Sequence, residues 1–158
     1  MFQRVTLIGH VGQDPDMRYT PDGTPVTSFS VATKTTLSKN MPGGGERSCP
    51  NGWKESYNGR NWELTTWWRV TAWRGLGETV NQYVTKGMQV FVEGEVSGDA
   101  QNGSQNPRVW TGNDGVARAS FELTARTVKF LGSRGDVGAE VPIGEPPPEG
   151  FEEDTLPF

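Results

Sequence analysis

Residues 65–74, with the sequence TTWWRVTAWR, constrain the fold more than any other segment, because they read as one β-strand. β-Branched and aromatic residues dominate the segment, and neither glycine nor proline interrupts it before Gly75. Side chains on a strand alternate between its two faces. The face predicted to cover a core carries Thr66, Trp68, Val70 and Ala72. The opposite face carries Trp67, Arg69, Thr71 and Trp73.

This second face has two interpretations. Burying both of its indoles against a core would also bury Arg69, which is rare for an arginine without a paired partner. Flat π-faces beside a fixed positive charge suit stacked bases joined by phosphates. Alternatively, the strand is a tryptophan-rich element buried on both faces of a β-sandwich. The segment by itself leaves both interpretations open.

The remaining chain up to residue 131 predicts an all-β domain with one helix. Apolar alternation predicts strands over residues 2–11, 24–36, 65–74, 88–98, 108–111 and 116–131. Apolar residues recur at helical spacing at Leu76, Val80, Tyr83 and Val84, which predicts a helix over residues 75–84. A helix between the third and fourth strands of a five-stranded antiparallel set fits the OB-fold barrel, which binds oligonucleotides or oligosaccharides. A β-sandwich is the alternative, but it needs more strands and does not predict the helix.

Two segments depart from this pattern. Residues 38–62 hold Gly43-Gly44-Gly45 and two Asn-Gly pairs, and are predicted to be a flexible insertion within the 1–131 domain. Residues 132–158 hold five of the eleven prolines and predict a disordered tail. Residues 133–158 carry one basic and seven acidic residues, a charge of −6, whereas the rest of the chain is at +2. The charge of the body therefore permits a nucleic-acid partner without demanding one.

Catalytic and metal-binding chemistry is sparse in the sequence. His10 is the single histidine, for which we expect a structural or interface role, and Cys49 is the single cysteine, so the zinc motifs fail. No GxSxG, Walker A or HExxH motif occurs. We therefore expect a protein that is not an enzyme, with no metal site and no cofactor. The lone cysteine and the lack of a signal, transit or membrane segment predict a cytoplasmic location.

Aromatic and basic residues form the remaining candidate site. Its proposed base-stacking residues are Trp67, Trp73 and Trp110, and its basic residues are Arg69, Arg108, Arg18, Lys34 and Lys86. Stacking on an aromatic side chain contributes ~1–3 kcal/mol per base and tolerates any sequence. For Trp110 and the lysines, a structural or solvated role is the simpler interpretation. A carbohydrate-binding OB module and a purely structural oligomerisation domain remain as alternative functions.

Motifs in a fixed order add a resemblance. They are Gly12-Gln13-Asp14-Pro15 with Arg18-Tyr19, Trp67-Trp68-Arg69-Val70 with Trp73, Lys86-Gly87 before a valine-rich strand, Arg108-Val109-Trp110-Thr111, and the terminal Asp154-Thr155-Leu156-Pro157-Phe158. Together they resemble the bacterial single-stranded DNA-binding proteins of the homotetrameric type, over about residues 4–131 and the last seven. Three features depart from that family. Leu37 stands where a stacking tryptophan is common, the 38–62 insertion is longer than usual, and Thr155-Leu156 replaces an isoleucine.

The resemblance implies a homotetramer in the bacterial nucleoid that binds single-stranded DNA without sequence specificity during replication, recombination and repair. It also implies stacking by the three tryptophans and phosphate contacts, or support of the aromatics, by Arg69, Arg18 and Arg108. Replication and repair enzymes would dock on the tip residues Glu152, Glu153, Asp154, Leu156, Pro157 and Phe158. Because Leu37 has no π-face, we hypothesise that Trp53 or Trp62 of the insertion supplies the missing stack. Alternatively, the insertion packs on a neighbouring subunit or stays disordered.

Overall fold

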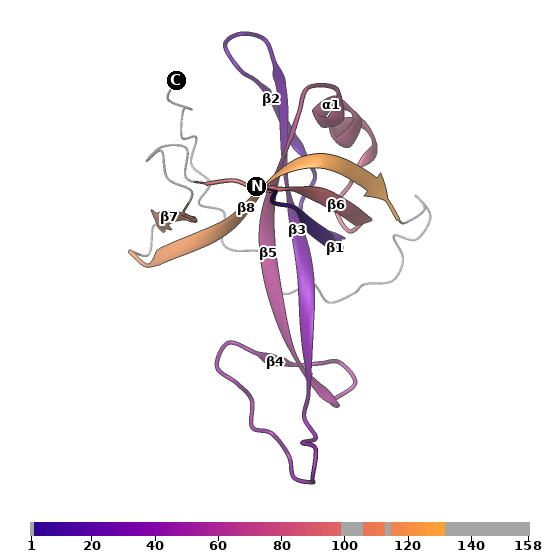
Figure 1. Ribbon diagram of the computed structural model, residues 1–158, viewed down its shortest axis with the longest axis vertical. Helices are drawn as coiled ribbons and strands as arrows, with labels where there is room; N and C mark the ends of the chain where they lie inside the picture. The colour runs from indigo at the N-terminus through magenta and orange to yellow at the C-terminus, as the bar shows by residue number, and fades with distance from the viewer. Residues whose placement is uncertain (1, 99–105, 113–114, 132–158) are drawn as a thin grey trace.

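The computed structural model describes residues 2–98, 106–112 and 115–131, which form a β-barrel with a long two-stranded arm (Figure 1). Along the chain the elements are β1 (Val5–Val11), β2 (Asp16–Tyr19), β3 (Pro25–Ser38), β4 (Lys54–Glu55), β5 (Asn61–Trp73), α1 (Arg74–Tyr83), β6 (Gln89–Val96), β7 (Arg108–Thr111) and β8 (Ala117–Phe130). The predicted tail, residues 132–158, lies outside the described residues.

Five strands close the barrel in the order β1, β6, β8, β5 and β3, with β3 pairing back to β1. The helix lies between the third and fourth of these strands along the chain, so the predicted OB-fold is confirmed. One pair differs from the antiparallel prediction, because β5 and β8 run parallel. A closed ring with an odd number of strands cannot alternate direction at every pair, so at least one pair must be parallel.

The barrel interior is filled by aliphatic side chains from every barrel strand. Its fully buried members include Val11, Val31, Val70, Val90, Val92 and Leu123. The predicted core faces are confirmed in β5, where Val70 and Ala72 are buried and Trp68 packs against the core from the barrel end. Each of these residues removes apolar surface from water, which is the main favourable term in folding.

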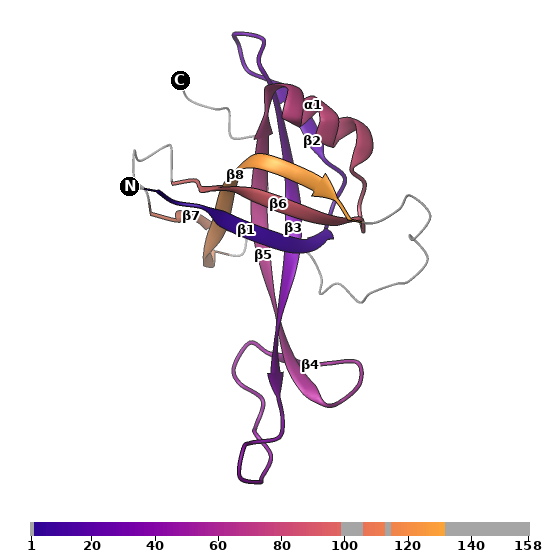
Figure 2. The same ribbon diagram turned by 45° about the vertical axis from the view of Figure 1, so that its right-hand side comes forward.

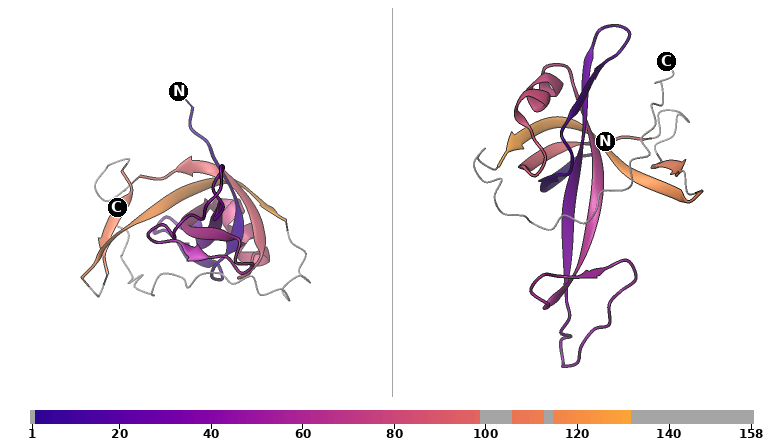
Figure 3. Two further views of the ribbon diagram at one scale, coloured as in Figure 1. Left: turned by 90° about the horizontal axis from the view of Figure 1, so that it is seen from below. Right: turned by 180° about the vertical axis from the view of Figure 1, so that it is seen from behind.

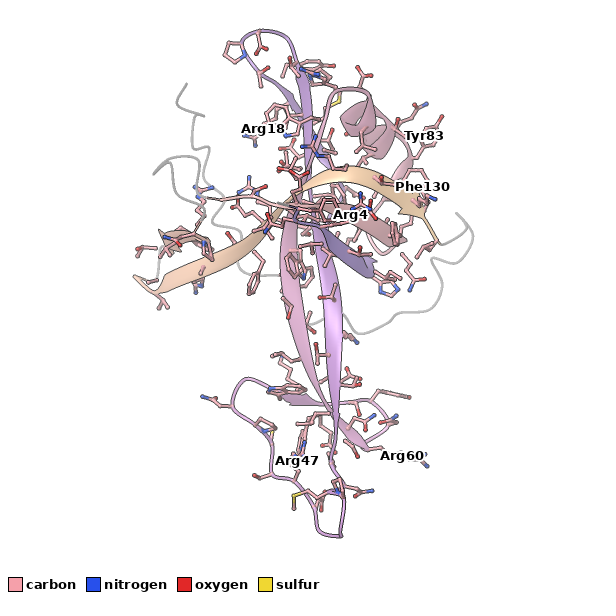
Figure 4. All side chains as sticks on the ribbon, in the orientation of Figure 1. Arg4, Arg18, Arg47, Arg60, Tyr83 and Phe130 are labelled. Atoms are coloured by element: carbon pink, nitrogen blue, oxygen red, sulfur yellow. The ribbon has the colours of Figure 1, made fainter. Side chains whose placement is uncertain are left out.

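Two aromatic residues, one on β8 and one on α1, are about half exposed. Phe121 of β8 is 52% exposed, and its ring lies 5.1 Å from the ring of Trp68. Phe121 lies on the same face of β8 as the buried Leu123 and Ala125, but towards the end of the strand that precedes them. Tyr83 is also 52% exposed, because the helix ends there and its ring lies 6.3 Å from that of Phe130 on the surface (Figure 4).

Helix α1 covers one end of the barrel and packs on β3 and β5 (Figure 2). A glycine is required at position 77, since an added Cβ would lie 2.7 Å from the carbonyl oxygen of Ala72. The hydroxyl of Thr27 donates a hydrogen bond of 2.8 Å to the Gly77 carbonyl and ties the helix to β3. Within the residues described, no helix combines the length and the apolar character that a membrane crossing requires.

The arm is the extension of β3 and β5 beyond the barrel, which Figure 3 shows from behind. The two strands stay paired from Lys34 opposite Thr65 to Ser38 opposite Asn61. The predicted insertion over residues 38–62 is therefore shorter than expected, because Ser38 and Trp62 belong to strands. Within it, β4 pairs with β5 and gives the arm tip, residues 39–60, regular structure of its own.

Candidate nucleic-acid interface

Strand register places most of the predicted site residues on one face of the sheet formed by β2, β3, β5, β8 and β7. Direct cross-strand partners point to the same face. Trp67 is the partner of Ala32, Arg69 of Ser30, and Trp73 of Val26. We call this surface the outer face, since the alternate residues of β3 and β5 fill the barrel.

The same rule adds the predicted cations of β2 and β3 to the outer face. Arg18 is the partner of Val26, and Val26 is the partner of Trp73. Lys34 lies opposite Thr65, two residues from Trp67 along β5. The outer face therefore combines two indoles with positive charges at both of its ends.

The hairpin of β7 and β8 extends the outer face on the other side of β5. Arg69 lies opposite Glu122 of β8, and the alternate residues Ser120 and Arg118 share that face. Arg108 pairs with Ser120 and Trp110 pairs with Arg118. The register therefore brings the third predicted tryptophan to the same face as the first two. The Arg118 guanidinium lies over the Trp110 ring, 5.4 Å from its centroid.

Small side chains line the middle of the outer face. Ser28, Ser30 and Ala32 of β3 alternate there, opposite Thr71, Arg69 and Trp67 of β5. They form a low floor beside the taller aromatic residues. Trp73 is 43% exposed, so a large part of its ring is open to solvent. A flat ring standing beside a low floor is a suitable platform for an unpaired base.

Two cations of the outer face form ion pairs with carboxylates. Arg18 Nε lies 2.8 Å from Asp16 Oδ2, and Lys34 Nζ lies 3.4 Å from Glu63 Oε2. The Arg18 pair is solvent-exposed, so it is weak and open to competition from phosphate. Figure 4 shows Arg18 on β2 at the side of the barrel away from the arm tip.

One predicted contact, Trp62, lies away from the outer face, and a second, Lys86, lies outside the strands that form it. Trp62 belongs to the opposite face of β5, because it lies five positions before Trp67 and side chains alternate along the strand. Lys86 follows the helix, and its backbone N–H donates a hydrogen bond of 2.7 Å to Asp14 Oδ1. Sequence spacing alone could not show that Lys86 is held at the β1–β2 corner.

The arm tip is organised around Trp62. Its Nε1–H donates a hydrogen bond of 3.0 Å to the carbonyl of Arg47. The ammonium of Lys39 lies 4.3 Å from the Trp62 ring centroid and forms a salt bridge with Glu55. Lys39 is buried, so this cation–π contact is shielded from water. Trp62 therefore supports the tip, which argues against the hypothesis that it replaces the missing stack.

Trp53 is held differently. Its carbonyl accepts a hydrogen bond from Cys49 Sγ at 3.3 Å, and its side chain is half-buried. The most open aromatic residue of the tip is Tyr57, which is 99% exposed. Arg47 and Arg60 flank this region at the end of the arm (Figure 4). Tyr57 is thus the most accessible aromatic residue of the tip, whereas the sequence hypothesis chose Trp53 or Trp62 for the stack.

Sequence reasoning also missed three residues near the outer face. Arg118 pairs with Trp110 across the β7–β8 hairpin, a signal available once the two strands were aligned. His10 is the partner of Ala32 and so lies on the same face as Trp67. Arg74 follows Trp73 with a φ of 56°, a left-handed conformation that no local pattern predicted.

The turn that faces Arg74 has a distinct electrostatic feature. A hydrogen bond from the Thr20 side chain, with further ones from its own backbone and from Thr24, holds the pKa of Asp22 below its usual value. The positive charge of Arg74 acts in the same direction. Among the described residues, no group of three or more histidine, cysteine or acidic side chains could hold a metal ion.

A comparison with protein families gives this surface its context. The model of the single-strand binding protein family matches residues 2–131. The chain belongs to this family. The resemblance seen in the sequence motifs is therefore confirmed. The family is named for binding and not for a reaction, which agrees with the expectation that the chain is not an enzyme.

Individual members of the family are also similar to this chain in sequence or in fold. The single-stranded DNA-binding protein of Neisseria meningitidis serogroup A is 33% identical over 142 residues, which cover 90% of this chain and 67% of that protein. Single-stranded DNA-binding protein 1 of Xylella fastidiosa is 35% identical over 133 residues, covering 84% and 79%. The structure of Plasmodium falciparum SSB in complex with ssDNA has a TM-score of 0.55 at 21% identity, covering 84% of this chain and 97% of that one. At that identity the likeness supports the fold alone.

Proposed function

We propose that the chain binds single-stranded DNA on its outer face without sequence preference. The observation that carries the proposal is the register of β2, β3, β5, β8 and β7, which gathers the three predicted tryptophans and the three predicted arginines on one surface, with Arg118 as a fourth arginine. The tryptophans Trp67, Trp73 and Trp110 would stack on bases. The arginines Arg18, Arg69 and Arg108 would contact phosphates or hold the rings in place.

This arrangement favours single strands over duplexes. In a single strand the base faces are accessible, and every base offers a π-face, so stacking tolerates any sequence. In a duplex the bases are already stacked on one another. The low floor of Ser28, Ser30 and Ala32 leaves room for bases beside the indoles.

A fluorescence titration tests the proposal. Oligothymidine should quench the tryptophan emission of the full chain, and the affinity should fall as salt rises because bound phosphates release counterions. With three arginine contacts, the slope of log K against log salt should be about −2, at about −0.7 per phosphate neutralised on a single strand. An unchanged emission at saturating DNA would contradict the proposal. Neutral oligosaccharides that bind with a salt-independent affinity would favour the carbohydrate alternative.

Assembly into a homotetramer is a further part of the proposal, and it is supported by β1. That strand pairs with β6 along Val5–His10 but with β3 only at His10 and Val11, which leaves most of one edge of β1 without a described partner strand. Ile8 is exposed on the same strand, with Phe91 as its cross-strand neighbour. A second copy could cover both the edge and these apolar residues. Native mass spectrometry should then show four chains; a monomer at micromolar concentration would contradict this part.

The tip residues 152–158 are proposed to recruit enzymes of replication, recombination and repair, and the nucleoid is the proposed location. The sequence supports this proposal, since acidic residues there precede Leu156, Pro157 and Phe158. Such a segment suits an apolar pocket with a basic rim. These residues lie outside the described structure.

A further inference from the structure

Gly12 touches the indole of Trp67 and leaves no room for a side chain. A Cβ added at Gly12 would clash with Cζ3 of Trp67 and would lie 2.9 Å from its Cη2. Both atoms belong to the six-membered part of the indole. The indole therefore rests its benzo edge directly on the backbone at the end of β1.

Backbone conformation does not explain the glycine at this position. The φ of Gly12 lies outside the left-handed region, so no left-handed conformation requires glycine here. Its N–H donates a hydrogen bond of 3.0 Å to the carbonyl of Ser30, which fixes its position against β3. Space for the Trp67 indole is what requires the missing side chain.

Ser30 completes the surface on which the indole rests. Its Oγ lies 2.8 Å from the position that a Cβ at Gly12 would occupy. That oxygen is buried and has no hydrogen-bond partner among the described residues. A buried hydroxyl without a partner costs stability. The placement of the Ser30 hydroxyl beside Gly12 is therefore not the one that would make the barrel most stable.

We propose that Gly12 is a positioning residue for Trp67. Together with Ser30, it forms the surface against which the indole packs, and this contact sets the angle at which the indole meets a base. The proposal rests on the proposed function, because it assigns Gly12 a role through the Trp67 stack. A methyl group at Gly12 would lift the benzo edge and tilt the ring while leaving the charges of the outer face unchanged. Ring orientation matters because stacking requires the face of the indole and not its edge.

The test measures the affinity of the full chain for fluorescein-labelled oligothymidine by anisotropy at one salt concentration. Trp67→Ala should weaken binding, which tests the proposed stack itself. Gly12→Ala should weaken binding by about fivefold or more, the lower end of what one stacked base contributes. Gly75→Ala is the matched control, because a Cβ there meets nothing within 4 Å and its φ is ordinary. It should bind like the wild type.

A smaller ring at position 67 separates positioning from a general structural defect. Phenylalanine keeps a π-face but lacks the benzo edge that touches Gly12, so Gly12→Ala should change the affinity of a Trp67→Phe chain by less than about twofold, as expected when the two sites act through one contact. Ser30→Ala should not rescue Gly12→Ala, since the clash with the indole remains.

The outcomes separate the two proposals. If Trp67→Ala weakens binding and Gly12→Ala does not, the role of Gly12 is overturned and the stack stands. If Trp67→Ala binds like the wild type, both are overturned. An equal loss from Gly12→Ala in the wild-type and Trp67→Phe chains would also overturn the positioning role. Should Gly12→Ala fail to fold, the double variant with Trp67→Phe tests the positioning role. A folded double variant that binds like Trp67→Phe supports this role, and an unfolded one contradicts it.

Discussion

At the residue scale, Trp67 and Trp68 are neighbours in the chain with opposite surroundings. Trp67 lies on the outer face over Gly12, whereas Trp68 packs against the core. Trp68 also donates a hydrogen bond of 3.2 Å from Nε1 to the hydroxyl of Thr33. One strand therefore carries adjacent indoles in two settings: Trp68 contributes to the core, and Trp67 is proposed to bind DNA.

Trp68→Ala should lower the free energy of unfolding by about 3 kcal/mol, since removing a packed indole leaves a cavity. Trp67→Ala should cost less stability and more oligothymidine affinity. Thermal melts and anisotropy titrations of the two variants measure both quantities. If the order were reversed, the assignment of the two faces of β5 would be wrong.

Arg74 offers a second prediction at this scale. A left-handed conformation costs a residue with a side chain about 1–2 kcal/mol. Arg74→Gly should therefore unfold with a free energy about 1 kcal/mol above that of Arg74→Ala, because both lose the guanidinium and only glycine relieves the strain. Denaturant unfolding of the pair measures the difference. Equal stabilities would show that the φ of 56° carries no strain.

At the scale of elements, the arm tip is a small packed unit attached to the barrel by two strands. Its internal contacts run from the Lys39 ammonium to Glu55 and Trp62, and from Trp62 to Arg47. These contacts join the tip to itself and to the base of β5. The tip can therefore be altered without removing any residue of the barrel core.

Replacing residues 40–59 by a short turn should leave the melting temperature and the oligomeric state nearly unchanged. Oligothymidine affinity should fall, because Tyr57 and the basic residues of the tip are removed with the segment. Tyr57→Ala is the matched single change, and it should reproduce part of the loss. An unaltered affinity would exclude the tip from DNA binding, and loss of the oligomer would assign it to assembly.

The elements show what the sequence could predict and what it could not. Strand and helix periods are local, so the core faces of Val70 and Ala72 and the helix were predictable. The parallel pairing of Trp68 with Phe121 joins residues far apart in the chain, and no local pattern encodes it. The extension of β5 back to Asn61 was missed because the glycines and Asn-Gly pairs just before it indicate a loop, although Leu37, Trp62 and Leu64 share one face of the arm.

For the candidate site too, local patterns were predictable from the sequence and tertiary pairing was not. The β5 pattern alone predicted Trp67, Arg69 and Trp73 on one face. Adding Arg18 and Trp110 to that face required the register of β2, β3, β8 and β7, which depends on tertiary pairing. The contacts of Trp62 with Lys39 and with the Arg47 carbonyl were not predictable, because they join residues that are 15 or more positions apart in the chain.

At the scale of the whole molecule, charge is divided between a body at +2 and a terminal segment, residues 133–158, at −6. Deleting residues 152–158 removes three acidic side chains. Affinity for oligothymidine should stay the same or rise slightly, because those charges compete with phosphate for the basic residues of the body. Pull-down of replication and repair enzymes should be lost. A truncated chain that still captures them would place the docking site elsewhere.

The central claim is that a single strand lies across the outer face of β2, β3, β5, β8 and β7. Photo-crosslinking of the full chain to oligothymidine containing 5-iodouracil, followed by mass spectrometry of the modified peptides, locates the bases directly. The account predicts crosslinks at Trp67, Trp73 and Trp110. Crosslinks confined to Trp62, to Trp68 or to Phe91 on the β1–β6 surface would contradict it.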